Sequence, residues 1–355
     1  MDIARIIELA RLATEIDESA KVTQVASGLN QHLSQLASNP ADQGAQTSVA
    51  RSMQSLKDSL EQAHFHLSPD ETELIGELAG APIFENYLVT SVEKSLQENP
   101  ATPAIARDLL MTLTQERDQA FAHFRQFIST SNSLGWDIRE IEEWEAEVGF
   151  QIPREIFQNE FDGPIGEFRF IRRFLAHLSE VSGSSMSDVK LARLSTTDPL
   201  VLLGVGFVVA RQVGTITKWA LDQWKTVEEI RKIRAETTKL KSFSAEEVDK
   251  IFGDKIREEL KLGVEEQVKL LTANVKPAAR RNELSNGLSK DLQEVLGRIE
   301  RGMKIEVRLV SSDEGGDDSE ETSNREQEIR GISSELKFPP ASASPVLQIT
   351  QQGPN

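Results

Sequence analysis

The sequence predicts a mainly α-helical protein of multi-helix bundle domains, with a small β element near 303–310 and a disordered acidic linker. Apolar residues recur at three- and four-residue steps through most of the chain, which is typical of amphipathic helices. Apolar and charged residues alternate over 303–309, which is typical of a strand. Charged residues make up 27% of the chain, close to the globular average of about 25%, so a folded body is expected.

The composition limits the number of domains and excludes several kinds of site. A chain of 355 residues forms two domains or one large one. The absence of cysteine excludes disulfides, a thiolate nucleophile and a cysteine-type zinc site. The net charge of −17 makes nucleic acid an unlikely partner, because nucleic-acid binding needs a basic surface. The first residues lack the pattern of a signal peptide, so we expect a cytoplasmic location, with a peripheral membrane location as the alternative.

Charge is distributed unevenly along the chain, and this predicts three segments. Residues 1–160 carry 11 basic and 26 acidic side chains, residues 161–312 carry 26 and 22, and residues 313–355 carry 3 and 9. Glycines and prolines between 149 and 166 mark a break in regular structure. We therefore expect an acidic helical domain over 1–160, a central helical domain over 161–310 and an acidic low-complexity linker and tail over 311–355.

The first half of the chain reads as a series of amphipathic helices. Apolar stripes begin at Ile3, Val22 and Met53. Ser68, followed by proline and two acidic residues, predicts the start of the next helix. Further helices are expected over 85–98, 104–129 and 136–148, and the residues from 150 to 153 read as extended because the position before a proline avoids the helical region.

The second half mixes helices with short strands. The spacing of Phe168, Ile171, Leu175 and Leu178 predicts an amphipathic helix that ends at Gly183. Strands are expected over 189–194, 303–309 and 346–349, paired with one another because isolated strands are unstable. A long helical stretch fills 200–300 and breaks at Pro277, and the charged segment 311–324 is expected to be disordered.

One apolar segment stands out. Residues 200–210 contain no charged or polar side chain, and we predict an apolar helix over 200–224. The eleven-residue run would span about 16 Å as a helix, too short to cross a bilayer core of about 30 Å alone. Three interpretations stay open: a buried core helix, a hidden membrane segment, or an oligomer seam that continues over 226–241 as a coiled coil. The candidate membrane- or partner-contacting residues are Leu200, Val201, Leu202, Leu203, Val205, Phe207, Val208, Val209, Trp219 and Trp224.

Two short stretches carry weak candidates for catalytic residues. Arg117 precedes His123 by six positions, and Arg172 precedes His177 by five. These stretches resemble the Arg-x(4–6)-His signature of the HEPN ribonucleases, and the polar Asp118 after Arg117 suits that signature. The resemblance implies metal-independent RNA cleavage at a composite dimer site. The alternative is that these are ordinary helix-surface arginines and partly buried histidines.

The sequence contains no motif that predicts a cofactor site. Glycine-rich phosphate loops and the motifs of serine hydrolases and zinc proteases are absent from the sequence. His64 and His66 lie two positions apart, and such residues face different sides of a helix, so no metal site is predicted. We expect neither a cofactor nor a metal.

The sequence therefore predicts a non-enzymatic helical interaction protein, an adaptor or regulatory subunit that acts through protein–protein contacts. A protein partner is expected, and a homo-oligomer and a membrane surface stay open. The first alternative is a membrane-acting effector that inserts 200–224, such as a pore-former-like toxin or a bacterial antiviral defence component. The second alternative is a HEPN-like ribonuclease.

Overall fold

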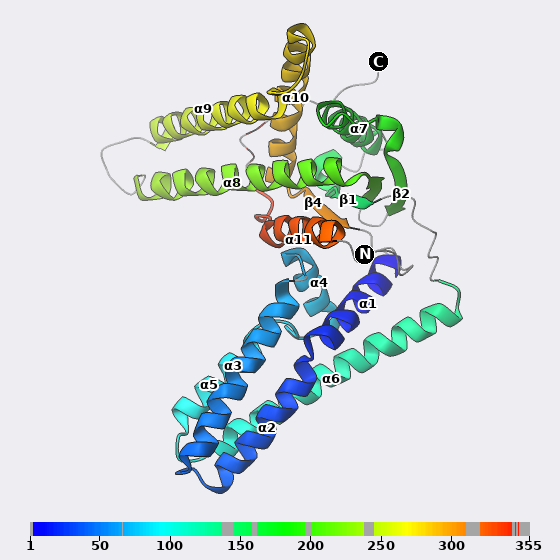
Figure 1. The fold of residues 1–355 in the computed structure, drawn as a ribbon. Coiled ribbons are helices and arrows are strands. Elements are labelled where there is room, and N and C mark those ends of the chain that lie inside the picture. Colours follow the sequence, from blue (N-terminus) through cyan, green and yellow to red (C-terminus); the bar gives the residue numbers. More distant parts are fainter. Residues whose placement is uncertain are drawn as a thin grey trace. The chain divides into compact units, whose positions relative to one another are not determined.

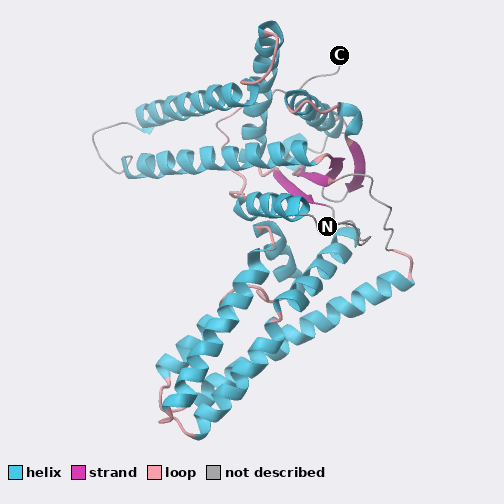
Figure 2. Ribbon diagram, in the orientation of Figure 1, coloured by secondary structure: helices cyan, strands magenta, loops and turns pink. Residues whose placement is uncertain are grey.

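The chain divides into two compact units, each with its own hydrophobic core (Figure 1). Unit 1 is Met1–Glu140 and unit 2 is Ile141–Asn355. The structure is a computed structural model that describes residues 3–65, 67–136, 145–157, 162–195, 200–237, 245–309, 320–342, 345 and 347. These residues contain eleven α-helices and one small antiparallel sheet, which confirms the predicted mainly α-helical fold (Figure 2).

Unit 1 is a bundle of helices around an aliphatic and phenylalanine core. Its helices are α1 (Ile3–Ala20), α2 (Val22–Ser38), α3 (Gln43–Phe65), α4 (Pro69–Ala79), α5 (Tyr87–Glu98) and α6 (Pro103–Ser133). Helix α2 packs against α3 and α6, and α5 packs against α6. Leu29, Leu33 and Phe121 are almost fully buried in the core, so the predicted apolar stripes do face one another.

The start of α4 follows the prediction. The Ser68 hydroxyl oxygen accepts a hydrogen bond from the Glu71 amide at 3.2 Å, and the Glu71 carboxylate accepts one from the Ser68 amide at 3.0 Å. This reciprocal pair is a capping box, which satisfies amides that have no partner within the helix. The helix ends at Gly80, whose φ of 70° is a left-handed conformation that glycine adopts without strain.

Unit 2 surrounds a four-stranded antiparallel sheet with helices. Its strands are β1 (Ala146–Gln151), β2 (Lys190–Ser195), β3 (Leu200–Val205) and β4 (Lys304–Leu309), in the order β2-β3-β1-β4. Its helices are α7 (Gly163–Val181), α8 (Phe207–Thr237), α9 (Ala245–Thr272), α10 (Ala278–Glu300) and α11 (Glu320–Glu335), with 3-10 turns at Arg154–Phe157 and Met186–Asp188. Strands β2 and β4 confirm two of the predicted strands, but the predicted pairing between them is wrong, because they are the two edge strands and β3 and β1 lie between them.

The two faces of the sheet differ in character. Val148 lies opposite Leu203 on β3 and Val307 on β4, and all three belong to the core that the helices cover. On the other face, Glu147 lies opposite Arg308, and their side chains form an ion pair with a 2.7 Å hydrogen bond. The register is therefore set by the apolar face, because a one-residue slip would bury the charged pair in the core.

The predicted apolar helix over 200–224 is wrong in its first part. Residues 200–205 form the strand β3, and the helix begins only at Phe207. Five of the six residues of β3 are buried, so both of its faces are covered and it needs no polar alternation. Gly206 separates strand from helix. A short apolar run bounded by proline and glycine is typical of a buried strand as well as of a buried helix. The prediction of a helix did not take the strand into account.

Three other predicted segments agree with the structure only in part or lie partly outside the described residues. The helix predicted over 136–148 gives way to β1 at its end, and residues 137–144 lie outside the described residues. The segment predicted to be disordered, 311–324, lies outside the described residues up to 319, but its last positions begin α11. Of the strand predicted over 346–349, only Leu347 is described, and it lies in a bend. Pro277 does break the long helical stretch, because α10 begins directly after it.

Candidate functional site

The segment proposed to meet a membrane or partner is mostly core. Val201, Leu202, Leu203, Val205, Phe207, Val209 and Trp224 are each at most 9% exposed. Leu200 and Trp219 are half-buried, and Val208 is 40% exposed. Among the described helices, none combines the length and the apolar character needed to cross a bilayer. The structure therefore places this segment in the sheet and the core of unit 2, where most of it is not accessible to a membrane or a partner.

Arg117 and His123 lie on different sides of α6. The Arg117 guanidinium is 3% exposed and donates to the Asp17 carboxylate at 2.6 Å, the Thr23 hydroxyl at 2.9 Å and the Ile83 carbonyl at 3.1 Å. Burial lowers the pKa of Arg117 from its ordinary value, and the nearby charge of Asp17 opposes that shift. His123 is exposed. The structure does not bring this pair together. Arg117 instead links parts of unit 1 through buried hydrogen bonds.

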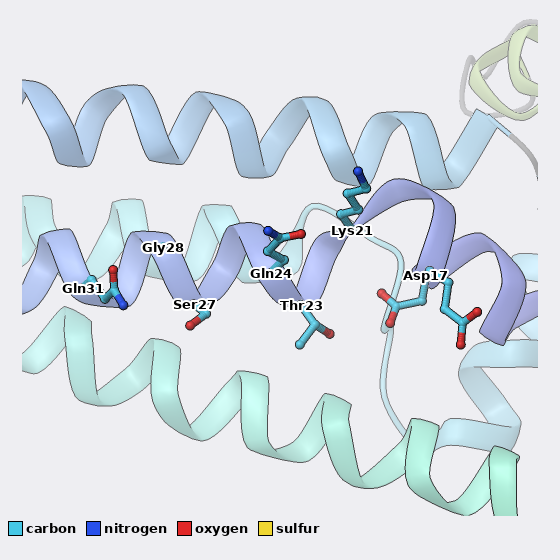
Figure 3. Close-up of a pocket in the computed structure, with 8 residues that line it drawn as sticks. Asp17, Lys21, Thr23, Gln24, Ser27, Gly28 and Gln31 are labelled. Carbon is cyan, nitrogen blue, oxygen red and sulfur yellow. The ribbon is translucent and has the colours of Figure 1, made fainter.

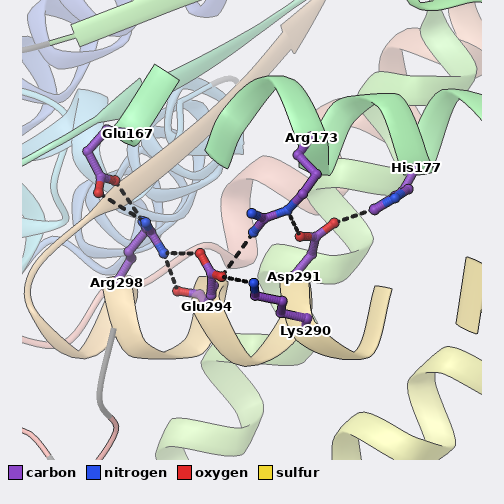
Figure 4. A network of polar contacts seen from close by, with 7 residues as sticks. All are labelled: Glu167, Arg173, His177, Lys290, Asp291, Glu294 and Arg298. Carbon is purple, nitrogen blue, oxygen red and sulfur yellow. Dashed lines mark hydrogen bonds and ion pairs between the residues drawn. The ribbon is translucent and has the colours of Figure 1, made fainter. Parts of the chain in front are cut away.

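His177 faces α10, but Arg172 does not. The His177 Nδ1 atom lies 2.6 Å from the Asp291 carboxylate (Figure 4). The next arginine along the chain, Arg173, donates to the other oxygen of Asp291 at 2.7 Å and lies 3.0 Å from Glu294. Arg172 is exposed and lies about 140° around the helix from His177. The sequence motif therefore picked the wrong arginine of the two as the neighbour of His177.

The same network continues along α7 and α10. Arg298 forms a two-pronged pair with the Glu167 carboxylate at 2.6 and 3.0 Å and a further contact with Glu294 at 3.0 Å. Its guanidinium carbon lies 3.7 Å from the centre of the Phe170 ring, a favourable cation–π position. Arg298 is 3% exposed and Glu294 6%, so this pairing is internal. Figure 4 shows the chain of contacts from Glu167 to His177.

The network fixes how α7 lies on α10. The helices are antiparallel, because Glu167 near the start of α7 pairs with Arg298, and Glu180 near its end pairs with Arg280 at 2.5 Å. The His177 ring lies so close to Gly287 that a Cβ atom there would be 2.7 Å from it. Contacts at both ends and in the middle hold the rotation of α7 about its axis, which decides which side chains point outward.

The network also separates the charges of the two helices. The carboxylates of Glu167, Asp291 and Glu294 are between 0% and 6% exposed. The basic side chains of Arg169, Arg172, Arg280, Arg281 and Lys290 lie on the surface. Two exposed carboxylates, Glu180 and Glu283, both pair with Arg280. In sequence, acidic and basic residues are interleaved on both helices, so this separation appears only in the fold.

The outward face of α7 carries apolar side chains beside arginines. Ile165, Phe168, Arg169 and Arg172 are spaced i, i+3, i+4 and i+7, so they share one side of the helix. Ile165 is 42% exposed and Phe168 37%. The core stripe of α7 is instead Phe170, Ile171, Phe174, Leu175 and Leu178. Phe168 was wrongly predicted to belong to the core stripe, and Phe170 and Phe174 were the signal in the sequence for the true one.

Unit 1 has an open groove along α2 (Figure 3). Its volume is about 560 Å³, and it is lined by Asp17, Glu18, Lys21, Thr23, Gln24, Ser27, Gly28 and Gln31. Arg117 neutralises Asp17 from the buried side. The lining mixes acidic, basic, amide and hydroxyl side chains and therefore indicates no particular ligand. Across the described ranges of the chain, no group of three histidine or acidic side chains is placed to hold a metal ion.

No protein family, curated protein or solved structure compared with this chain matches it. The outward face of α7, held in place by the polar network on α10, is the candidate functional site.

Proposed function

We propose that this chain is a non-catalytic interaction protein, an adaptor or regulatory subunit, that binds a partner protein through the outward face of α7. The observation that carries the proposal is the exposure of Ile165 and Phe168 side by side on a helix whose opposite side is core. Single exposed apolar residues are ordinary, but an aromatic and an aliphatic side chain beside two arginines have the composition of a protein interface.

The polar network supports this proposal by fixing the face that α7 presents. Side chains that could take part in chemistry, such as Arg173 and Asp291, are paired with each other instead of lining an open cavity. Such pairing contributes little net stability but fixes geometry, because breaking one partner leaves a buried charge. A helix held against rotation keeps Phe168 and Arg172 outward, and a partner then meets a preformed surface.

The test compares two matched exposed sites by affinity capture. Phe168→Asp and Leu270→Asp each place a carboxylate on an exposed helix position, and Leu270 is 68% exposed on α9. We expect the wild-type chain and Leu270→Asp to capture the same partner, and Phe168→Asp to lose it while circular dichroism stays unchanged. Equal capture by all three proteins would contradict the proposal.

A second candidate function is phosphodiester cleavage at His177, as the resemblance to HEPN ribonucleases implies. One observation favours it: Asp291 binds Nδ1 of His177, an arrangement that orients a histidine for general-base work through Nε2. The test is cleavage of single-stranded RNA by wild type, His177→Ala, Arg173→Ala and Arg172→Ala. If this candidate is correct, the wild-type protein cleaves RNA, and His177→Ala and Arg173→Ala abolish the cleavage. The interaction proposal instead predicts that neither the wild-type protein nor any of the variants cleaves RNA.

A further inference from the structure

We infer that the partner of α7 offers an acidic, partly apolar protein segment. This inference rests on the proposed function and adds the chemistry of the partner to it. It starts from the charge that unit 2 presents around Ile165 and Phe168. Although the whole chain has a net charge of −17, the outward side of α7 is basic.

The arginines on this face are available to a partner. In the part of the chain that the structure describes, neither Arg169 nor Arg172 makes an ion pair, and both are exposed. The nearby carboxylates of α7 and α10 are already paired inside the fold. Asp291 binds Arg173, and Glu167 binds Arg298. Salt screens charges beyond about 8 Å at physiological ionic strength, so this local basic surface matters more to a docking segment than the net charge does.

The spacing of the four side chains limits what can bind. From Ile165 to Arg172 the face extends about 10 Å along the helix axis. Two apolar side chains on a partner helix or strand fit Ile165 and Phe168, and adjacent carboxylates can each accept two hydrogen bonds from Arg169 or Arg172. The face therefore has an apolar end, at Ile165 and Phe168, and a basic end, at Arg169 and Arg172, and both aromatic side chains and arginine are enriched in protein interfaces.

Other anionic partners fit this face less well. Anionic membranes are recognised by clusters of about four to eight basic residues, and this face has two unpaired arginines. Nucleic-acid affinity also grows with the number of phosphates neutralised. Of the two apolar side chains, only Phe168 offers a ring on which a base can stack. An acidic protein segment uses all four side chains.

The experiment selects peptides from a random library displayed on phage, using immobilised full-length protein. The proteins are wild type, the double variant Arg169→Glu/Arg172→Glu and the control Arg125→Glu, which changes an exposed arginine on α6. We expect wild type and Arg125→Glu to enrich acidic peptides with two apolar residues. The double variant should bind these peptides about tenfold more weakly or worse, because attractive pairs become repulsive, and it should enrich basic peptides instead.

Enrichment of neutral or basic peptides on wild type, or binding that survives the double substitution, would overturn the inference. Vesicles containing phosphatidylserine and single-stranded polyuridylate are tested in the same buffer. Binding of either that is lost in the double variant, without acidic-peptide binding, would assign the face to that ligand instead. If Phe168→Asp abolishes partner capture but the double variant does not, the proposed function stands and this inference alone fails.

Discussion

Arg117 ties three helices of unit 1 together through a single buried guanidinium. It reaches Asp17 on α1, Thr23 on α2 and the Ile83 carbonyl from its own position on α6. Arg117→Met removes the cation and leaves the Asp17 carboxylate buried without a partner. We expect unit 1 to lose about 3–5 kcal/mol of stability, because an unpaired buried charge is costly. Urea-dependent hydrogen exchange in α6 peptides measures the loss.

The matched control is Arg125→Met on the same helix, where the arginine is exposed. It should change the stability by no more than about 0.5 kcal/mol, as surface substitutions usually do. Equal losses in the two variants would show that Arg117 contributes through helix propensity or packing and not through its buried charge.

Glu180 and Arg280 give a prediction about acid sensitivity. The hydrogen bond from Arg280 lowers the pKa of the Glu180 carboxyl below its ordinary value. A lowered pKa means that the pair stabilises the fold above the ordinary glutamate pKa of about 4.3, and the contribution is lost as the pH falls through the lower folded-state value. Arg280→Gln should return the pKa of Glu180 toward its ordinary value. A carbon-detected NMR titration of the glutamate carboxyls checks this, and an unchanged pKa would mean that Arg280 does not act on it.

The candidate site was only partly predictable, because its residues contact partners far away in the sequence. Arg173 was visible in the sequence, but its partner Asp291 lies 118 positions away. No periodicity links two helices that far apart, so the choice between Arg172 and Arg173 needed the fold. Phe168 was counted as core because it shares the spacing of Ile171, Leu175 and Leu178. The phenylalanines at 170 and 174 define the buried side better, since large aromatic side chains bury more apolar area.

Elements were predictable where one periodicity was dominant. Strand β4 alternates between Ile305, Val307 and charged neighbours, because only one of its faces meets the core, so it was predicted correctly. Strand β3 is covered on both faces and reads as a continuous apolar run, which a buried helix also produces. The helices of unit 1 each expose one face, so their apolar periodicity could be recognised in the sequence.

Helix α11 approaches α8 closely at Gly214. A Cβ atom at Gly214 of α8 would lie 2.7 Å from Ile332 of α11, closer than ordinary contact. Gly214→Val should therefore push α11 away from α8 and β4. We expect faster hydrogen exchange over 324–335 with little change in β1 and β3. Exchange that is unchanged over α11 would mean that Ile332 yields without moving the helix.

Gly331→Ala, on α11 itself, is the matched control. A Cβ atom at Gly331 would meet no heavy atom within 4 Å, so the substitution introduces no clash. Alanine is a better helix former than glycine by about 0.5–1 kcal/mol. This variant should slow exchange over α11, the direction opposite to Gly214→Val.

At the scale of the whole molecule, the two cores predict two folding units. The core of unit 1 and the core of unit 2 share no residue among those described. We expect fragments 1–136 and 145–355 to fold separately, each with a cooperative urea transition. A fragment that shows no cooperative transition, or that lacks the helical content it has in the whole chain, would contradict this expectation.

The whole-molecule charge gave a misleading picture of the binding surface. A net charge of −17 made nucleic acid an unlikely partner and indicated no basic surface, yet the carboxylates of α7 and α10 are mostly buried in pairs. Summed charge does not record which side chains are paired inside the fold. The surface of unit 2 could therefore be derived only after the α7–α10 contacts were known.

The central claim, that the outward face of α7 binds a partner protein, is tested most directly by cross-linking from within that face. The photoreactive residue p-benzoylphenylalanine replaces Phe168 in one protein and Leu270 in another, and both positions are exposed. Irradiation in the native cell extract should join the protein substituted at 168 to one second polypeptide, and the protein substituted at 270 should give no such product. The same products from both positions, or none from 168, would contradict the account.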